Sequence, residues 1–481
     1  MSGINVAPSL VAAVRATVSR APGAEAVVDL AGGHRFTYAD LWQASSEVAG
    51  GLVDRGVRPG DRVAVALPNG APWTLAFLGT LLASGVPVPL NPRLTGPERA
   101  HIIADSGARI VIDRELPRGR ATEVDDADPE SLAALFYTSG TTGAPKGAML
   151  SHRALLSSAE QVRLAYRLAP TDGLRSLVAA PLFHVLACGM QWIPALVSGG
   201  SVAIMPAFEV GAWVDAIREE RVEVLNGVPA MFWQALRHPD FVGLDVSGVR
   251  IVSYGAAPTP PAQAQALREA FPNARLAPGY GLTEAPCVTG LQDDDALAQS
   301  GSVGTAVAGT ELRLLGPQAE AGIGQLILRG PQVMSGYWGR PDDTARVMVD
   351  GWLHTGDIVR IDPQGRVHLL DRRTDMINRG GENVYSVEVE AALAAYPAVG
   401  ESAVVAVPDE RLGGRVGACV VPRSGMSFDA SELVRVARES LAAFKVPELL
   451  CLRSDPLPRN PAGKVDKAAV RSQSVWTPIH P

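Results

Sequence analysis

From about residue 61 the chain alternates short apolar runs with longer helical patterns, and this alternation constrains its fold more than any other feature. The candidate strands are residues 62–67, 109–113, 132–137, 201–205, 222–226 and 249–254. The candidate helices between them are residues 72–84, 210–221 and 260–271. Strands that are apolar throughout and alternate with helices are typical of parallel sheets covered by helices. The sequence therefore predicts an α/β fold.

Two changes of pattern predict how the chain is divided. We expect a large N-terminal domain over residues 1–373, with two βα-type sheets and, from the glycine-rich strand signals at 309–337, a small β-barrel-like subdomain. After residues 371–375, a new order of helix, two strands, helix and strand begins. About 100 residues is enough for a whole small domain. We therefore predict a small, mobile α+β C-terminal domain over residues 375–481, with a hinge at residues 371–375.

Residues 137–147 read YTSGTTGAPKG, and this composition suits the binding of a phosphate group. Glycines bring bare N–H groups close to a ligand, hydroxyls donate hydrogen bonds, and Lys146 supplies a positive charge. A Walker loop needs Ser or Thr after its lysine, but Gly147 stands there, and a dinucleotide GxGxxG pattern at residues 279–284 fails at Glu284. We interpret the segment as a phosphate loop between a strand and a helix that begins near residue 151; an ordinary exposed turn is the alternative.

Composition and charge exclude several classes of partner. A net charge of -7 provides no basic footprint for nucleic acid. The 4 cysteines are scattered without a CxxC pair, which indicates free thiols in a reducing compartment. The N-terminus lacks the order of a signal peptide, and Pro and Gly interrupt the apolar stretches 67–91 and 177–208. We expect a cytoplasmic protein without an integral membrane segment.

Six further segments bear on function when they are read together with the loop at 137–147. They are APLFHVLACG (180–189), SYGAAP (253–258), GYGLTE (279–284), GWLHTGD (351–357), LLDRRTDMINRGGENVYSVEVE (369–390) and PRNPAGK (458–464). In this order they resemble the motifs of the adenylate-forming superfamily, which includes AMP-dependent acyl- and aryl-CoA synthetases, luciferases and adenylation domains of peptide synthetases. The resemblance spans nearly the whole chain.

The resemblance implies that ATP and Mg²⁺ bind at these motifs. The implied ATP- and AMP-binding residues are Thr138, Ser139, Gly140, Thr141, Thr142, Gly143, Lys146, Gly255, Ala256, Ala257, Gly279, Tyr280, Gly281, Thr283, Asp357, Arg372 and Lys464. Thr141 and Glu284 would hold the metal. The residue chemistry agrees for Glu284, a carboxylate that follows a strand expected to end near Ala277. Taken alone, Glu284 could also begin a helix and Asp357 could belong to a turn.

The same resemblance implies a reaction in two halves, with Lys464, His184 and Glu284 as catalytic residues. Lys464 would assist attack of a carboxylate on the α-phosphate of ATP, and the C-terminal domain would then rotate about the hinge. Arg379, Gly380 and Gly381 would bind CoA. Three positions depart from the family pattern, and one of them is Gln325, in a segment where a Glu is common. Thr374 stands at the pivot where many relatives carry Asp or Lys, and Ser386 stands where many CoA ligases carry Pro.

The acid is constrained by the residues expected to line its pocket. These are His184, Val185, Cys188, Gly189, Val228, Met231, Ala256 and Leu282. No Asp or Glu lies between Asp172 and Glu209, so nothing there would pair with the ammonium of an amino acid. No arginine follows Arg175 in that stretch, which disfavours a dicarboxylate. We expect an apolar monocarboxylate, either an aryl acid or a medium-chain fatty acid.

CoA is the expected acceptor, because GGENVY followed by SVEVE resembles free-standing CoA ligases. The phosphopantetheine of a separate carrier protein is the alternative. A nucleotide-binding protein without enzymatic activity is disfavoured by the set of Lys464, Glu284 and Asp357.

Overall fold

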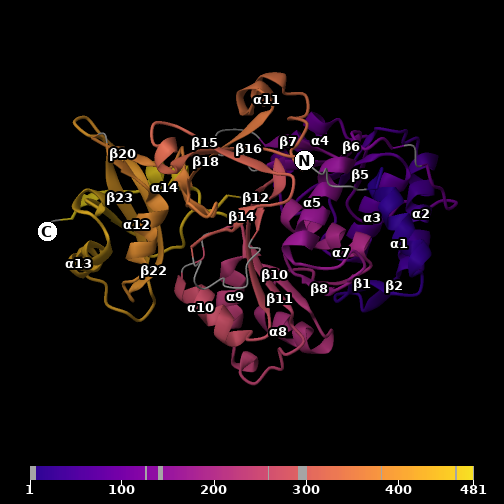
Figure 1. The fold of residues 1–481 in the computed structure, drawn as a ribbon, viewed down its shortest axis with the longest axis horizontal. Helices are drawn as coiled ribbons and strands as arrows, with labels where there is room; N and C mark the ends of the chain where they lie inside the picture. Colours follow the sequence, from indigo (N-terminus) through magenta and orange to yellow (C-terminus); the bar gives the residue numbers. More distant parts are fainter. Residues whose placement is uncertain are drawn as a thin grey trace. The chain divides into compact units, whose positions relative to one another are not determined.

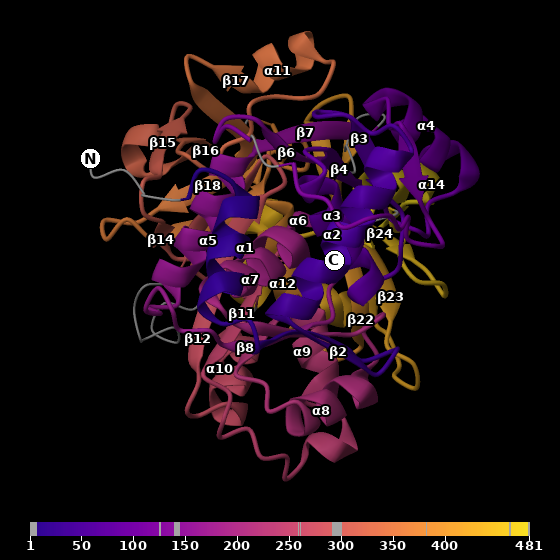
Figure 2. The ribbon, with the colours of Figure 1, turned by 90° about the vertical axis from the view of Figure 1, so that its right-hand side faces the viewer.

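The structure is a computed structural model, and it describes residues 7–124, 127–138, 145–257, 259, 261–290, 301–380, 382–460 and 463–479. The chain divides into two compact units. The first comprises Met1–Leu312, Leu328–Leu353 and Pro363–Val367, and the second comprises Arg313–Ile327, His354–Asp362 and His368–Pro481. Figures 1 and 2 show the elements of each. The mixed α/β class is confirmed, while the boundary at Thr374 and the hinge at 371–375 stay predictions.

The largest sheet of the described chain belongs to the first unit and has the strand order β14-β13-β12-β11-β10-β8-β9-β1-β2. Its strands are β1 (Glu25–Asp29), β2 (His34–Thr37), β8 (Arg175–Val178), β9 (Ser201–Ile204), β10 (Val224–Gly227), β11 (Ile251–Gly255), β12 (Arg275–Leu282), β13 (Ala285–Gly290) and β14 (Thr305–Ala306). Neighbours from β12 to β1 are parallel, and the outer pairs are antiparallel. The carboxyl ends of β10, β11 and β12 therefore meet at one edge, where ligands bind in open α/β sheets.

A smaller parallel sheet has the order β4-β3-β5, from β3 (Arg62–Val65), β4 (Val86–Pro89) and β5 (Ile110–Ile112). Beside it, β6 (Leu132–Thr138) and β7 (Lys146–Ser151) form an antiparallel pair. The strand before the phosphate loop and the helix expected near residue 151 are both present, but a strand that was not predicted, β7, lies between the loop and that helix. The loop joins two strands, and α5 (His152–Ala165) begins only after β7, with Ser151 as its N-cap.

The other helices of the first unit cover these sheets. They are α1 (Leu10–Arg20), α2 (Tyr38–Asp54), α3 (Ala71–Leu82), α4 (Gly96–Ser106), α6 (Val185–Ala187), the π-helix η1 (Cys188–Trp192), α7 (Ile193–Ser198), α8 (Val210–Glu219), α9 (Pro229–Ala235), the 3₁₀ turn η2 (Pro239–Phe241), α10 (Pro261–Ala270) and α11 (Pro341–Val347). The predicted helices at 72–84, 210–221 and 260–271 are confirmed as α3, α8 and α10. Figures 1 and 2 show α1, α5 and α7 side by side.

The apolar stretch 67–91 has a structural explanation, because every residue of α3 except Pro72 is buried. Its rings Trp73 and Phe77 lie against Trp192, with centroid distances of 5.8 and 5.4 Å. Within the described residues, no helix combines the length and apolarity needed to cross a membrane.

A further sheet stands where the β-barrel-like subdomain was expected. It has the order β15-β16-β18-β17, with β19 paired to β18. Its elements are β15 (Glu311–Leu315), the 3₁₀ turn η3 (Ala319–Ala321), β16 (Ile323–Arg329), β17 (Met348–Val349), β18 (Trp352–Ile361) and β19 (Val367–Arg372).

The C-terminal part of the second unit is an α+β arrangement. Its elements are β20 (Ile377–Arg379), β21 (Glu382–Val384), α12 (Ser386–Leu393), β22 (Val399–Asp409), β23 (Gly413–Pro422), α13 (Ala430–Ser440), the 3₁₀ turn η4 (Ala443–Lys445), β24 (Leu449–Leu452), α14 (Lys467–Gln473) and β25 (Thr477–Pro478). Alternation along β22 and β23 buries both faces: Val404 belongs to the core of α12 and α13, while Ala403 belongs to that of α14. Figure 1 shows α12 and α13 beside β22 and β23. The sequence missed β20, β21, α14 and β25.

Candidate active site

The phosphate-loop residues Ser139, Gly140, Thr141, Thr142 and Gly143 lie outside the described residues, but both ends of their loop are described. Thr138 and Lys146 are the last cross-strand pair of the β6–β7 hairpin. The Lys146 ammonium forms an ion pair with Asp343, with Nζ 3.0 Å from Oδ1, and lies 5.4 Å from the centroid of the Tyr337 ring. The predicted phosphate cation is thus held at the mouth of the loop.

The segment around Tyr337, which sequence reasoning missed, connects this hairpin to Glu284. Its backbone pairs with β7, because Trp338 N–H donates to Gly147 O at 2.8 Å. Met334 N–H donates to Glu284 O at 2.8 Å, and the Tyr337 hydroxyl donates to Glu284 Oε1 at 2.6 Å. Tyr337 is only 8% exposed. One aromatic side chain therefore contacts both the predicted metal carboxylate and the predicted phosphate lysine.

Glu284 and Thr283 form the turn between β12 and β13. The strand expected to end near Ala277 continues as β12 to Leu282, and the alternative for Glu284, a helix start, is not what the structure shows, because β13 begins at the next residue. Antiparallel pairing with β13 extends β12 beyond the parallel core. Gly279, Tyr280 and Gly281 consequently lie within the strand.

Close backbone contacts explain the glycines at this edge of the sheet. A Cβ on Gly255 would lie 2.6 Å from Gly279 O, and one on Gly281 would lie 1.9 Å from Pro286 O. Ala256, the next residue after β11, adopts a left-handed φ of 62°. Left-handed backbone in a residue with a Cβ is strained and tends to occur at functional sites. Ala256 and Ala257 are both exposed at this strand end, as expected for ligand-contacting residues.

The predicted acyl-binding residues come from two regions of the first unit. His184 is the N-cap of α6, Val185 begins that helix, and Cys188 and Gly189 begin the π-helix. Val228 and Met231 lie at the start of α9, directly after β10, where Leu282 ends β12. Val185, Val228 and Leu282 are partly exposed, whereas Cys188 and Gly189 are buried. Burial raises the pKa of the Cys188 thiol, so it behaves as an apolar wall rather than as a nucleophile.

Two residues of this region were not predicted. The Asn69 side chain accepts a hydrogen bond from Leu182 N–H at 2.8 Å and donates to Ala180 O at 2.9 Å, which braces the turn before His184. Gln191 lies in the π-helix and is 3% exposed, and neither of its amide atoms has a partner among the described residues. A π-helix changes the side-chain spacing, and such segments are frequent at functional sites. No feature of the sequence indicated it.

In the second unit, the structure brings together two residues that the sequence assigned to the nucleotide. Asp357 Oδ1 lies 3.0 Å from Arg372 Nε, with the Asp357 side chain 7% and the Arg372 side chain 47% exposed. Asp357 lies in β18 and Arg372 ends β19, so the ion pair joins adjacent strands. An isolated turn, the alternative for Asp357, is not what the structure shows.

Arg379, a predicted CoA-binding residue, forms a two-contact ion pair with Glu448, with distances of 2.7 and 3.1 Å. This contact holds the pKa of Glu448 below its usual value. Gly380 has a left-handed φ of 62°, while Gly381 falls outside the described chain.

Lys464 lies on an exposed turn that is held by its own hydrogen bonds. Its N–H donates to Asn460 Oδ1 at 3.1 Å, and its carbonyl accepts from Asn460 N–H at 2.8 Å. Arg459 and Val465 form a bridge across the base of the turn. The turn that carries Lys464 therefore has a base that is fixed by backbone contacts.

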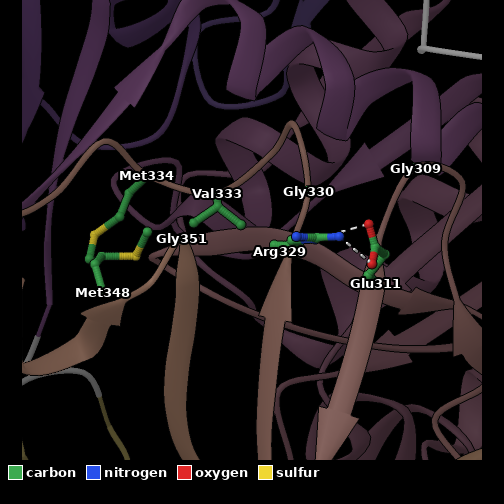
Figure 3. A pocket seen from close by; sticks show the side chains of 8 residues that line it. All are labelled: Gly309, Glu311, Arg329, Gly330, Val333, Met334, Met348 and Gly351. Carbon is green, nitrogen blue, oxygen red and sulfur yellow. Dashed lines mark hydrogen bonds and ion pairs between the residues drawn. The ribbon is translucent and has the colours of Figure 1, made fainter. Parts of the chain in front are cut away.

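A separate surface pocket of the first unit contains none of the predicted site residues. Figure 3 shows the Arg329–Glu311 ion pair at one side of this pocket, with distances of 2.8 and 2.9 Å, and Met334 and Met348 at the other. The opposed charges neutralise each other, so the pocket provides no charged anchor for an anionic ligand.

Comparison with known proteins agrees with the motifs. The family profile described as AMP-binding enzyme matches residues 14–126 and 115–338, and that of the AMP-binding enzyme C-terminal domain matches residues 388–464. Feruloyl-CoA synthase of Amycolatopsis sp is 41% identical over 92% of this chain and 94% of its own length. Long-chain-fatty-acid–CoA ligase FadD13 of Mycobacterium tuberculosis is 33% identical over 95% of this chain and 97% of its own.

Solved structures show the same relationship in three dimensions. ATP-bound MatB from Rhodopseudomonas palustris has a TM-score of 0.87 at 31% identity, covering 97% of this chain and 98% of that chain. MenE from Bacillus subtilis, in complex with the acyl-adenylate intermediate OSB-AMP, has a TM-score of 0.87 at 27% identity, covering 98% of each chain. Profiles, relatives and structures therefore agree: the chain belongs to the AMP-binding enzyme family, and it is an AMP-forming acyl-CoA ligase of the adenylate-forming superfamily.

Proposed function

We propose that this enzyme joins an apolar monocarboxylic acid to CoA, and that its preferred acid is an aryl acid of the ferulic type. The carboxylate attacks the α-phosphate of ATP, which gives an acyl-adenylate and releases pyrophosphate. The CoA thiol then attacks the acyl carbon, which gives a thioester and releases AMP.

The absence of a usable charge in the acyl region carries the proposal for an apolar acid. Residues 173–208 contain no Asp or Glu, so a substrate ammonium has no partner there. Arg175, the one arginine of that stretch, is already engaged, because its Nη1 lies 2.5 Å from Glu25 Oε1. An aryl acid is favoured by the 41% identity to a feruloyl-CoA synthase, and a fatty acid, suggested by the similarity to FadD13, is the second candidate.

The described residues have distinct proposed roles toward ATP. Lys146 binds the phosphates and exchanges its contact with Asp343 for them, while Thr138 and Thr283 donate hydroxyl hydrogen bonds. Asp357 accepts hydrogen bonds from the ribose hydroxyls, and Arg372 orients that carboxylate. Tyr280, with Gly255, Ala256 and Ala257, provides the surface for adenine. Lys464 stabilises charge on the α-phosphate during adenylation.

Glu284 fits the role of a Mg²⁺ ligand. The Tyr337 hydroxyl binds Oε1, and within the described part of the chain no side chain is bonded to Oε2, which leaves that oxygen for a metal. Among the described residues, no group of three or more His, Cys, Asp or Glu could hold a metal, and Mg²⁺ is typically held by one or two carboxylates together with substrate phosphates. The ion would neutralise charge on the phosphates, while Tyr337 fixes the orientation of the carboxylate that receives it.

A panel of acids tests the substrate. Ferulic, coumaric, benzoic and C6 to C12 fatty acids are supplied with ATP and Mg²⁺, with phenylalanine and malonate as charged controls, and pyrophosphate and acyl-CoA are measured. We expect the highest kcat/KM for an aryl acid and no turnover of the two controls. Preference for phenylalanine or malonate would contradict the proposal of an apolar acid. Thioester formation on a phosphopantetheinylated carrier protein but not on CoA would support the alternative acceptor.

The role of Lys464 is tested by separating the two half-reactions. Lys464→Ala should abolish pyrophosphate release from acid and ATP, yet leave thioester formation from synthetic acyl-adenylate and CoA intact. Equal loss of both half-reactions would refute a role confined to adenylation.

A further inference from the structure

A buried polar network in the second unit connects the predicted hinge to the base of the Lys464 turn. Ser386 is fully buried, at 0% exposure, and begins α12. Its N–H donates to Asp371 Oδ2 at 2.5 Å, and its hydroxyl donates to Asp371 Oδ1 at 2.9 Å. Asp371 is itself 7% exposed and opens the predicted hinge. The first residue of α12 is therefore bonded twice to the first residue of the hinge.

Lys467 completes this network from the other side. Its ammonium donates to the Ser386 hydroxyl at 2.5 Å and to Glu390 Oε1 at 2.7 Å. Glu390 also accepts a hydrogen bond from Val404 N–H at 2.8 Å, which ties it to β22. The Lys467 side chain is 16% exposed, so the cation is sheltered from solvent and compensated by acidic partners.

Lys467 stands only three residues after Lys464, where the turn ends and α14 begins. Asp466 N–H donates to Pro458 O at 2.8 Å and closes the base of the turn. The short segment between the two lysines therefore has little freedom to move. The chain that enters the turn is held separately, because Arg459 lies 2.8 Å from Glu401. The chain that leaves the turn is held by the network to α12 and to Asp371.

We propose, on the basis of the function proposed above, that Lys467 is a positioning residue: through Ser386 and Asp371 it makes the Lys464 turn move as one body with the end of the hinge. Ser386 serves as the link in this chain of contacts. Its N–H and its hydroxyl both donate to the hinge carboxylate, and the hydroxyl also accepts a hydrogen bond from Lys467. A proline at this position has neither group. The network acts on adenylation, because that is the half-reaction in which Lys464 takes part.

The test measures both half-reactions separately in full-length variants, together with thermal unfolding. Lys467→Met should lower kcat for pyrophosphate release by tenfold or more, since a displacement of about 1 Å at a catalytic group can cost about a hundredfold. Thioester formation from synthetic acyl-adenylate should stay within twofold of wild type. Lys467→Arg should restore adenylation, and Ser386→Ala, which keeps the N–H bond to Asp371, should have a smaller effect than Lys467→Met.

Lys445 provides a matched control. It forms a comparable ion pair with Glu388, at 2.7 Å and with its side chain 21% exposed, on the same helix α12. Lys445→Met should leave both half-reactions unchanged.

For folded Lys467→Met, either unchanged adenylation or equal loss of both half-reactions would overturn the proposal. A double variant, Lys467→Met with Glu390→Gln, removes both charges; if it folds normally and adenylates normally, the proposal also fails. The two proposals fail in different variants. If Lys464 has no role in adenylation, Lys464→Ala will still release pyrophosphate, and this result does not depend on any change at Lys467.

Discussion

Tyr337 gives the sharpest test of the site. Its hydroxyl donates to Glu284 Oε1 at 2.6 Å, while its ring lies under the Lys146 ammonium. Tyr337→Phe removes the hydroxyl and retains the ring, so it isolates the contact to Glu284. A hydrogen bond to a charged group contributes about 1.5 to 3 kcal/mol.

The smaller value applies here, because Glu284 is only partly buried and water replaces part of the lost bond. About 1.4 kcal/mol corresponds to a factor of ten. We therefore expect Tyr337→Phe to lower kcat/KM for adenylation about tenfold and to raise the Mg²⁺ concentration needed for half-maximal rate. Residues that orient metal ligands typically show effects of about 10- to 100-fold.

Pyrophosphate release is measured against Mg²⁺ concentration at saturating ATP and acid. Tyr38→Phe is the control, since its buried hydroxyl donates to Gly200 O at 2.7 Å in the same unit but away from the motifs. The control should lose stability without losing adenylation. If both variants lose activity in proportion to their loss of stability, or if the Mg²⁺ dependence of Tyr337→Phe is unchanged, the reasoning is refuted.

Two further predictions concern stability. Ala256→Gly should stabilise the fold by about 1 kcal/mol because it relieves a left-handed φ of 62°. Ala257→Gly is the control: this position has no left-handed φ, so the change should destabilise the fold. Urea unfolding measures whether the free energy of unfolding rises or falls in each variant. The hydrogen bond and charge of Arg379 lower the pKa of Glu448 below its ordinary value of 4.5, so the stability from this pair is present above that value and is lost as pH falls through the lowered pKa. Glu448→Gln should therefore be less stable than wild type near pH 6 and show a flatter decline on acidification, and a parallel decline of both proteins would contradict the assignment.

The sequence predicted those parts of the fold and site that depend on local pattern. Apolar runs marked the strands of the parallel core, and the motifs named Asp357 and Arg372, which the structure places 3.0 Å apart. The missed features depend on pairing between distant segments. Tyr337 is 53 residues from Glu284, and Arg379 is 69 from Glu448. No periodic pattern in the sequence indicates contacts over such separations. The strand β7 was missed because its pairing with β6, rather than its composition, makes it a strand.

Ser386 shows how a departure from a family pattern acquires a physical meaning only in three dimensions. In the sequence it was a serine in place of proline. In the structure the buried Asp371 carboxylate accepts hydrogen bonds from Ser386 N–H, the Ser386 hydroxyl and Arg372 N–H. Proline at residue 386 would remove the first two donors and leave a carboxylate of 7% exposure with Arg372 N–H as the one remaining donor of these three, which is costly. Positions 371 and 386 should therefore be coupled. Ser386→Pro should be strongly destabilising in the native background and much less so when Asp371 is replaced by Ala, and additive effects in that double-mutant cycle would show that the bonds contribute little.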